Sequence, residues 1–261
     1  MTKSLIGPND PPPFEVVNPM GSAEILLVCD HASHAVPQAM DRLGLEENVI
    51  QDHIGWDIGA LEVAVRMSEW LGVPAIVAGY SRLVIDYNRP PEATDRIPPV
   101  SDGVMIPGNQ SLATEHVEAR VQTFFDPYHE TIANTIDAYL ARDAVPVVVS
   151  IHSFAPMIGG AHRPWDACVC SDRDRRVAEP LMEELSKEGL HVGDNEPFAF
   201  EGPSDHTIPE HGIKRGLPHV LVEMRNDQLR DAEGVTQWAE RLCRTLTTVL
   251  ADPQIRRIER F

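Results

Sequence analysis

The chain has 261 residues, a length that fits one large α/β domain or two small ones. It contains 22 Lys and Arg against 40 Asp and Glu, and the resulting net charge of −18 disfavours nucleic acids and anionic membranes as partners. No apolar run approaches the roughly 18 residues of a membrane span. The N-terminus lacks the apolar stretch of a secretory signal, and four cysteines do not suggest a disulfide framework. We therefore expect a cytoplasmic protein that binds neither nucleic acids nor membranes.

Hydrophobic patterns predict strands that alternate with helices. The proline-rich stretch 1–22 is expected to be an irregular arm, followed by a single domain over 23–261. Strands are expected at the short apolar runs 24–29, 73–80, 81–88, 145–152, 168–171 and 218–225. Helices are expected at 48–71 with a firm start near Asp57, 112–143 with an interruption at Asp126-Pro127, 174–189 and 231–250. The segment 90–110, rich in proline, is expected to be a long loop that closes over the site.

This order of elements implies a three-layer α/β/α fold with a mostly parallel or mixed central sheet. In such folds, functional sites form at the carboxyl ends of the strands. Four of the expected strands end in polar groups: Asp30-His31, Asp86-Tyr87-Asn88-Arg89, His152-Ser153 and Glu223-Met224-Arg225. Because the runs before them are too apolar to be exposed, we expect these groups to meet in one site.

Two of these strand ends carry natural metal ligands, His31 and His152. A catalytic zinc takes three protein ligands from His, Asp or Glu and keeps one position for water. Asp57, at the expected start of a helix, is a candidate for the third ligand, and Asp30 and His34 compete with it. The alternative is structural, with His31 and His34 at a strand–helix turn and Asp57 as a helix cap.

Glu223 ends the last apolar strand. A carboxylate beside an activated water can act as general base and then protonate a departing amine. The alternative is a structural salt bridge to Arg225, because side chains two residues apart share one face of a strand.

Asn88 and Arg89 follow an expected strand directly, and Arg82 stands seven residues before Arg89. The planar fork of an arginine suits a carboxylate, and an asparagine adds an amide donor. The pair therefore favours a substrate with a free carboxylate. The alternative is that Arg89 braces the proline-rich loop.

Other chemistries lack their motifs. The chain has no G-x-S-x-G elbow of a serine hydrolase, no nucleotide-binding P-loop and no G-x-G-x-x-G dinucleotide fingerprint. Cys168 and Cys170 have no second cysteine pair after them, so we expect inert core thiols.

Five sequence blocks between residues 25 and 230 together resemble the N-formylglutamate amidohydrolase family: VCDHASHAVP, DHIGWDIGA, SRLVIDYNRP, SIHSFAP and HGIKRGLPHVLVEMRND. The resemblance implies a zinc-dependent hydrolase of the phosphorylase/hydrolase-like fold, related in architecture to carboxypeptidases and aspartoacylases. It further implies that His31, Asp57 and His152 hold one zinc ion and that Glu223 activates the water.

The resemblance also suggests how substrate is held. Asn88 and Arg89 are similar to the pair that binds the substrate carboxylate in carboxypeptidases and aspartoacylases. Arg82 and Arg225 are implied for a second carboxylate, and His211 for orienting the substrate or stabilising the oxyanion.

We therefore expect an amidohydrolase of a small N-acyl amino acid, with N-formyl-L-glutamate as the first candidate, giving formate and glutamate. The alternatives are a peptidoglycan-type amidase or carboxypeptidase on the same scaffold and a non-catalytic binder of acidic amino acids.

Overall fold

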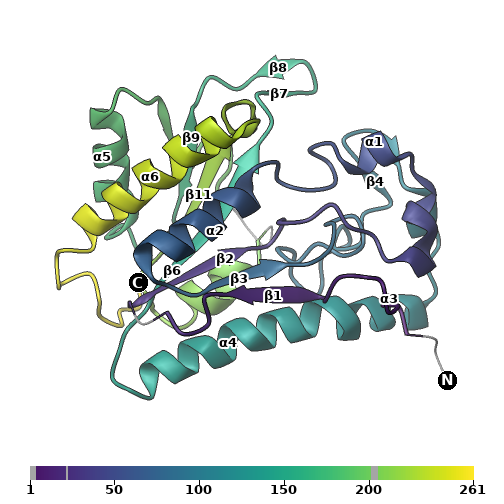
Figure 1. Ribbon diagram of the computed structural model, residues 1–261, viewed down its shortest axis with the longest axis horizontal. Helices are drawn as coiled ribbons and strands as arrows, with labels where there is room; N and C mark the ends of the chain where they lie inside the picture. Colours follow the sequence, from purple (N-terminus) through teal and green to yellow (C-terminus); the bar gives the residue numbers. More distant parts are fainter. Residues whose placement is uncertain (1–3, 22, 201–204) are drawn as a thin grey trace.

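A computed structural model describes residues 4–21, 23–200 and 205–261. Its main strands are β1 (Phe14–Val17), β2 (Ile25–Cys29), β3 (Ala75–Ala78), β6 (Val147–Phe154), β9 (Ala167–Cys170), β10 (Val192–Asp194) and β11 (His219–Arg225). They form a mixed sheet in the order β1-β3-β2-β6-β11-β9-β10 (Figure 1). Strands β3, β2, β6 and β11 are parallel, while β1 and β9 run antiparallel to their neighbours β3 and β11. The expected α/β fold with a mixed central sheet is confirmed.

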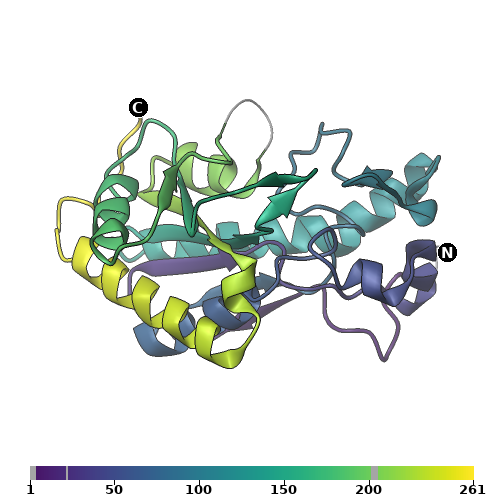
Figure 2. The same cartoon turned by 90° about the horizontal axis from the view of Figure 1, so that it is seen from above.

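Helices cover both faces of this sheet (Figures 1 and 2). One face packs against α2 (Ala60–Leu71), α5 (Ala178–Lys187) and α6 (Ala232–Val249). The other packs against α4 (Asp126–Leu140). The remaining helical segments are α1 (Glu47–Ile50), α3 (Thr114–Arg120), the 3₁₀ segments η1 (Gln38–Gly44), η2 (Pro107–Asn109) and η5 (Asn226–Leu229), and the π-helical turns η3 (Val121–Phe125) and η4 (Pro209–Ile213). In the described part of the chain, no helix combines the length and the apolar character needed to span a bilayer.

Side-chain alternation along β6 and β11 separates the core from the site. Ile151 and Val222 pack toward α2, α5 and α6. The side chains of His152 and Glu223 therefore point to the opposite face, and the two residues are direct partners in the parallel ladder.

The N-terminal arm is not irregular throughout, because Phe14–Val17 forms the edge strand β1. Residues 1–3 and 22 of the arm lie outside the described residues. Since β1 occupies the free edge of β3, the sheet has no position there for the expected strand 81–88. That prediction was wrong: 81–88 forms turns, and Leu83, Val84 and Ile85 are buried against the α4 face instead.

The expected helix 48–71 consists of two helices, α1 and α2, separated by turns that contain two glycines. The expected helix 112–143 is present as the run α3, η3 and α4. The expected interruption at Asp126-Pro127 does not break it: the chain stays helical there, and only the π-helical turn η3 just before Pro127 is irregular. A proline lacks the N–H of a regular helical hydrogen bond and crowds the preceding turn, which accounts for the irregularity at this point.

Three features carry no clear sequence signal. One is strand β10, and the others are the short hairpins β4–β5 (Val100–Ser101 and Val104–Met105) and β7–β8 (Met157–Ile158 and Ala161–His162). The first hairpin belongs to the segment 90–110, which apart from this hairpin and the 3₁₀ segment η2 is loop as expected. Its residues Ser101 and Asp102 line the cavity described next.

Candidate active site

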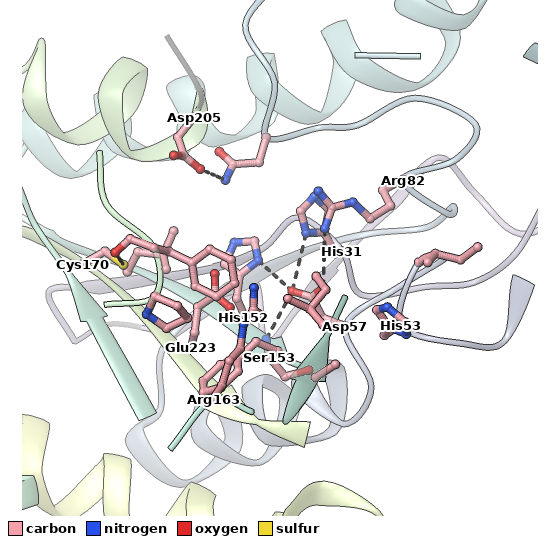
Figure 3. Close-up of a pocket in the computed structure, with 18 of the residues that line it drawn as sticks. His31, His53, Asp57, Arg82, His152, Ser153, Arg163, Cys170, Asp205 and Glu223 are labelled. Carbon is pink, nitrogen blue, oxygen red and sulfur yellow. Dashed lines mark hydrogen bonds and ion pairs between the residues drawn. The ribbon is translucent and has the colours of Figure 1, made fainter. Parts of the chain in front are cut away.

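A cavity of about 510 Å³ opens at the carboxyl edge of β2, β6 and β11 (Figure 3). Its polar floor contains His31, Asp57, His152 and Glu223. The apolar side chains that line it include Phe154, Ile158, Phe198, Phe200 and Leu221. Pockets of this size and mixed lining suit small-molecule ligands.

The two histidines of the cavity floor converge on one carboxylate. The Nδ1 of His152 lies 2.8 Å and the Nδ1 of His31 lies 3.5 Å from the same oxygen, Oδ2 of Asp57. Asp57 is fixed in place because its backbone N–H donates to the carbonyl of His31 over 2.9 Å. These three buried residues form a group whose ligand atoms lie close enough together to hold a metal ion.

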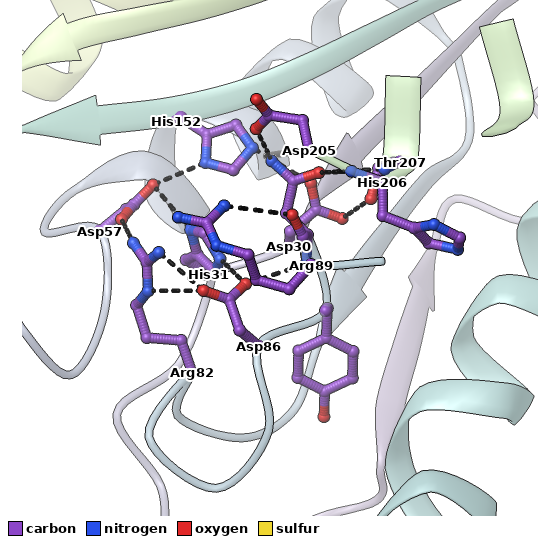
Figure 4. A network of polar contacts seen from close by, with 12 residues as sticks. Asp30, His31, Asp57, Arg82, Asp86, Arg89, His152, Asp205, His206 and Thr207 are labelled. Atoms are coloured by element: carbon purple, nitrogen blue, oxygen red, sulfur yellow. Dashed lines mark hydrogen bonds and ion pairs between the residues drawn. The ribbon is translucent and has the colours of Figure 1, made fainter. Parts of the chain in front are cut away.

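The far nitrogens of both rings are held by other aspartates (Figure 4). The Nε2 of His31 lies 2.7 Å from Asp86, and the Nε2 of His152 lies 3.1 Å from Asp30. A carboxylate at Nε2 favours the proton there and leaves Nδ1 as the atom that can bind a metal. Asp30 therefore supports His152 from behind and does not join the group of ligand atoms.

Outer contacts hold Asp30 and Asp86 in turn. The hydroxyls of Tyr128 and Thr207 donate to Asp30 over 2.9 and 2.7 Å. Arg82 donates to Asp86 through Nε and Nη2 over 3.1 and 2.7 Å. Burial would raise the pKa of Asp30, but its contacts with His152 lower that pKa to about 2, so the carboxylate stays charged.

The group of His31, Asp57 and His152 fits a divalent metal ion. Zinc is the divalent metal most often bound by His and Asp side chains. Two ligands of a tetrahedral zinc lie roughly 3.3 Å apart when each bond is about 2.0–2.1 Å, close to the separations from Asp57 given above. The Nδ1 of His31 is fully buried and has no hydrogen-bond partner among the described residues. A buried nitrogen without a partner is costly, and a metal ion would satisfy it.

The net charge of the buried group also favours a bound cation. Asp30, Asp57 and Asp86 bring three negative charges and Arg82 one positive charge, which leaves two negative charges if both histidines are neutral. Burial would lower the pKa of His152, but its hydrogen bonds to the carboxylates of Asp30 and Asp57 raise that pKa well above the ordinary value. A divalent cation would supply in one ion the charge that two histidine protons otherwise supply.

Glu223 is placed beside this group by the strand ladder. Burial raises its pKa to about 7, and the charge of Asp57 adds to the shift while His152 opposes it. The expected alternative, a salt bridge to Arg225, does not form: Arg225 pairs with Asp227 over 2.9 Å and with Asp166 over 3.6 Å. Glu223 is thus a carboxyl group of shifted pKa that faces the cavity.

Asn88 and Arg89 line the cavity on a turn and not after a strand. The Nδ2 of Asn88 donates to Asp205 over 2.7 Å, and its Oδ1 accepts from the backbone N–H groups of His206 and Thr207. Asn88 therefore joins the 205–207 segment to the cavity wall. Arg89 pairs with Asp95 over 3.1 Å, which matches the bracing contact considered as an alternative for this residue.

Three residues named from the sequence lie away from the cavity lining. Arg225 is turned toward Asp166 and Asp227, as described above. His211 is buried and stacked on His129, with 3.0 Å between its Nε2 and the Nδ1 of His129. His34 packs edge-on against Trp56 and is not part of the group whose ligand atoms lie together.

Sequence reasoning missed several residues of the site. Arg163 and Asp205 line the cavity but stand outside the strand-end blocks from which the site was inferred. Asp86 was named only among the polar groups at the end of the expected strand 81–88, with no role of its own. The sequence alone does not indicate Arg163, because this residue follows a short hairpin that has no clear sequence pattern.

The fold and this cavity define a class of protein. A His-Asp-His group next to a carboxyl group of raised pKa, at the carboxyl edge of an α/β sheet, is typical of hydrolases that use a metal ion. Comparison with protein families makes this more specific: the model of N-formylglutamate amidohydrolase matches residues 23–230. The chain belongs to the N-formylglutamate amidohydrolase family, whose members act on an amide bond.

Solved structures share the fold of this chain. The gene product Atu2144 from Agrobacterium tumefaciens is similar over 96% of this chain and 99% of its own, with 32% identity and a TM-score of 0.92. The N-formylglutamate amidohydrolase from Ralstonia eutropha JMP134 shares the fold, with 17% identity, a TM-score of 0.64 and coverage of 93% of this chain and 99% of its own. No curated protein matches the chain.

Proposed function

We propose that this protein is a zinc-dependent amidohydrolase that cleaves the amide of a small N-acyl amino acid, with N-formyl-L-glutamate as the first candidate substrate. The observation that carries the proposal is the buried group of His31, Asp57 and His152 next to Glu223 in a cavity of ligand size. Membership of the N-formylglutamate amidohydrolase family supports the reaction class and the candidate substrate.

In this proposal, Nδ1 of His31, Nδ1 of His152 and a carboxylate oxygen of Asp57 hold one zinc ion. When bound, zinc supplies Lewis acidity, which makes the acyl carbonyl more electrophilic and water a better nucleophile near neutral pH. Asp86 and Asp30 keep the two imidazoles in the tautomer that presents Nδ1. Arg82 acts through Asp86, whose position it fixes, and does not bind substrate.

Glu223 is the proposed general base and acid. It accepts a proton from the attacking water as the oxygen adds to the acyl carbon. It then gives that proton to the amine nitrogen as the C–N bond breaks, so one proton is taken up and returned in each turnover. A carboxyl group with a pKa near 7 is suited to both transfers at neutral pH.

Asn88 and Arg89 are proposed to bind the α-carboxylate. The Nδ2 of Asn88 carries two hydrogens, of which Asp205 accepts one. The remaining hydrogen and the cationic Arg89 give two-point recognition of an anion at this side of the cavity. His211 and Arg225 have no part in this proposal, because neither lines the cavity.

The test combines metal content with product release. Purified protein is analysed for metals, and formate release from N-formyl-L-glutamate is followed before chelation, after chelation and after zinc is restored. We expect close to one zinc per chain and formate release that is lost and regained with the metal. Protein that takes up no metal even from added zinc contradicts the ligand assignment, whereas zinc without formate release contradicts the candidate substrate alone.

A further inference from the structure

The arginines of the cavity differ in their partners. Among the described residues, three arginines line it. Arg82 is committed to Asp86, and Arg89 pairs with Asp95. Arg163, which the sequence did not single out, has no ion pair or side-chain hydrogen bond to any part of the chain that the structure describes.

The position of Arg163 is fixed without the use of its donors. Its backbone N–H donates to the carbonyl of Pro156 over 2.9 Å, across the β7–β8 hairpin. Its guanidinium carbon lies 4.7 Å from the ring centre of Phe198 and 5.8 Å from that of Phe154. Such cation–π contacts orient the planar group while its N–H fork stays available to a carboxylate.

The electrostatic setting favours an anionic ligand at this point. Arg163 is half-buried, and none of the carboxylates that the structure describes forms an ion pair with it, so an anionic ligand would neutralise this partly desolvated cation. Figure 3 shows Arg163 on the side of Glu223 and Ser153, whereas Asp205, the partner of Asn88, lies on the other side of His152. A substrate with two carboxylates can therefore place one at each side of the reacting carbonyl.

We propose that Arg163 binds the side-chain carboxylate of the substrate and thereby restricts the enzyme to N-acyl derivatives of acidic amino acids. This inference rests on the proposed function. It replaces Arg82 and Arg225, which the sequence suggested for the second carboxylate: the first is neutralised by Asp86 and the second lies outside the cavity lining.

The experiment compares substrates that differ in one charge. The ratio of kcat/KM for N-formyl-L-glutamate to kcat/KM for N-formyl-L-glutamine is measured in the wild type, Arg163→Met and Arg163→Lys. We expect a wild-type ratio of roughly 10 to 100, the range for a hydrogen bond to a charged group. Arg163→Met should bring the ratio to about 1 by lowering only the glutamate value, and Arg163→Lys should restore part of it.

A matched control is Arg142→Met. Arg142 is exposed and stacks on Tyr139 with 4.4 Å between the guanidinium carbon and the ring centre, so this change removes a similar cation–π contact away from the cavity. Its ratio should equal that of the wild type. If Arg163→Met keeps the preference for glutamate, or loses both activities equally, Arg163 does not read the side-chain charge.

A binding measurement separates this inference from the proposed function. Calorimetry of zinc-loaded protein with L-glutamate and L-glutamine reports the same contact without turnover. Stronger binding of glutamate that disappears in Arg163→Met supports the inference even if no N-acyl substrate is cleaved, an outcome that would remove only the proposed function. Equal binding of both amino acids by the wild type overturns the inference even if the amide is hydrolysed.

Discussion

At the scale of residues, the site depends on which nitrogen of each histidine faces which carboxylate. His31 and His152 each place Nε2 against an outer aspartate and Nδ1 toward Asp57. An exchange of the two nitrogens would present N–H groups where ligand atoms are needed. The outer aspartates Asp30 and Asp86 therefore orient two of the proposed ligands, a role whose loss typically costs roughly 10–100-fold in metal affinity.

The first residue-level prediction concerns Glu223→Gln. Glutamine keeps the size of the side chain but cannot accept and return a proton. We expect kcat to fall by roughly 10²–10⁴-fold, the range for general acid–base catalysis. The zinc content should not change, because Glu223 is not among the proposed ligands. Steady-state kinetics and elemental analysis on the same preparation check both points, and a rate within a few-fold of the wild type would exclude Glu223 as the base.

A second residue-level prediction is that the stability of the protein depends on pH through the buried pair His211 and His129. Burial lowers the pKa of His211 to about 3, so the folded state binds fewer protons than the unfolded chain at any pH between that value and the ordinary one. Stability is therefore fully present above the unfolded pKa of about 6.5 and is lost as the pH falls. Between pH 7.5 and 5.0 the loss from this one group is about 2 kcal/mol.

His211→Gln removes the titrating group but keeps an N–H donor for His129. Urea unfolding at pH 7.5 and 5.0, with chelator present so that metal release does not contribute, should show a smaller acid-induced loss in this variant than in the wild type. The exposed His116→Gln serves as control and should follow the wild type. Equal losses in all three proteins would contradict the shifted pKa.

At the scale of elements, the turn before α2 connects the core to the site. Asp57 stands two residues before Gly59, which has φ of +82° and precedes α2 directly. A Cβ at Gly59 would lie only 2.4 Å from Cβ of Leu229, in the segment that follows β11. Glycine at this position therefore lets the start of α2, and with it Asp57, approach the end of the last strand.

We predict that Gly59→Ala is more destabilising than Gly72→Ala at the other end of α2. Gly72 also has a positive φ, +64°, but a Cβ there meets nothing within 4 Å. Backbone strain of roughly 1 kcal/mol applies to both variants. Overpacking adds about 1–3 kcal/mol in Gly59→Ala alone. Urea unfolding measures the difference.

Metal binding distinguishes the same two variants. Zinc competition with a chromogenic chelator should show weaker binding in Gly59→Ala only, because the clash displaces the turn that carries Asp57. Equal stability losses together with unchanged zinc affinity in both variants would show that the approach to Leu229 is not a constraint on the site.

At the scale of the whole molecule, the proposed ligands come from segments far apart in the sequence. His31 follows β2, Asp57 precedes α2 and His152 lies on β6, so they meet only when the sheet and its helical layers have formed. An ion held by all three binds the folded state and not the unfolded chain, and it stabilises the fold by linkage.

We therefore expect zinc to raise Tm relative to chelated protein. Free zinc at a thousand times its dissociation constant adds about 4 kcal/mol to the free energy of unfolding. Calorimetry of the wild type and His152→Ala, each with chelator and with zinc, provides the measurement. The variant should show little response, and an equal rise of Tm in both proteins would place the zinc elsewhere.

Much of the fold and the centre of the site could be predicted from the sequence. The run 145–152 is so apolar and so rich in β-branched residues that it indicates a buried strand, and 218–225 carries a shorter apolar run up to Glu223. Polar residues at the ends of such runs must lie at the carboxyl edge of the sheet. His152 and Glu223 were therefore placed in the cavity by local pattern alone, and His31 by the same rule.

Other features depended on contacts between distant segments. Strand β1 pairs with the edge of β3, so the segment 81–88 forms buried turns and not a strand of the sheet. Asp30 contacts the Nε2 of His152, whereas Asp57 contacts its Nδ1. Arg163 lines the cavity and Arg225 does not. Periodicity along a chain specifies which face of an element is buried. The choice between two carboxylates or two arginines depends on distances of a few ångströms across the fold, which only the tertiary structure sets.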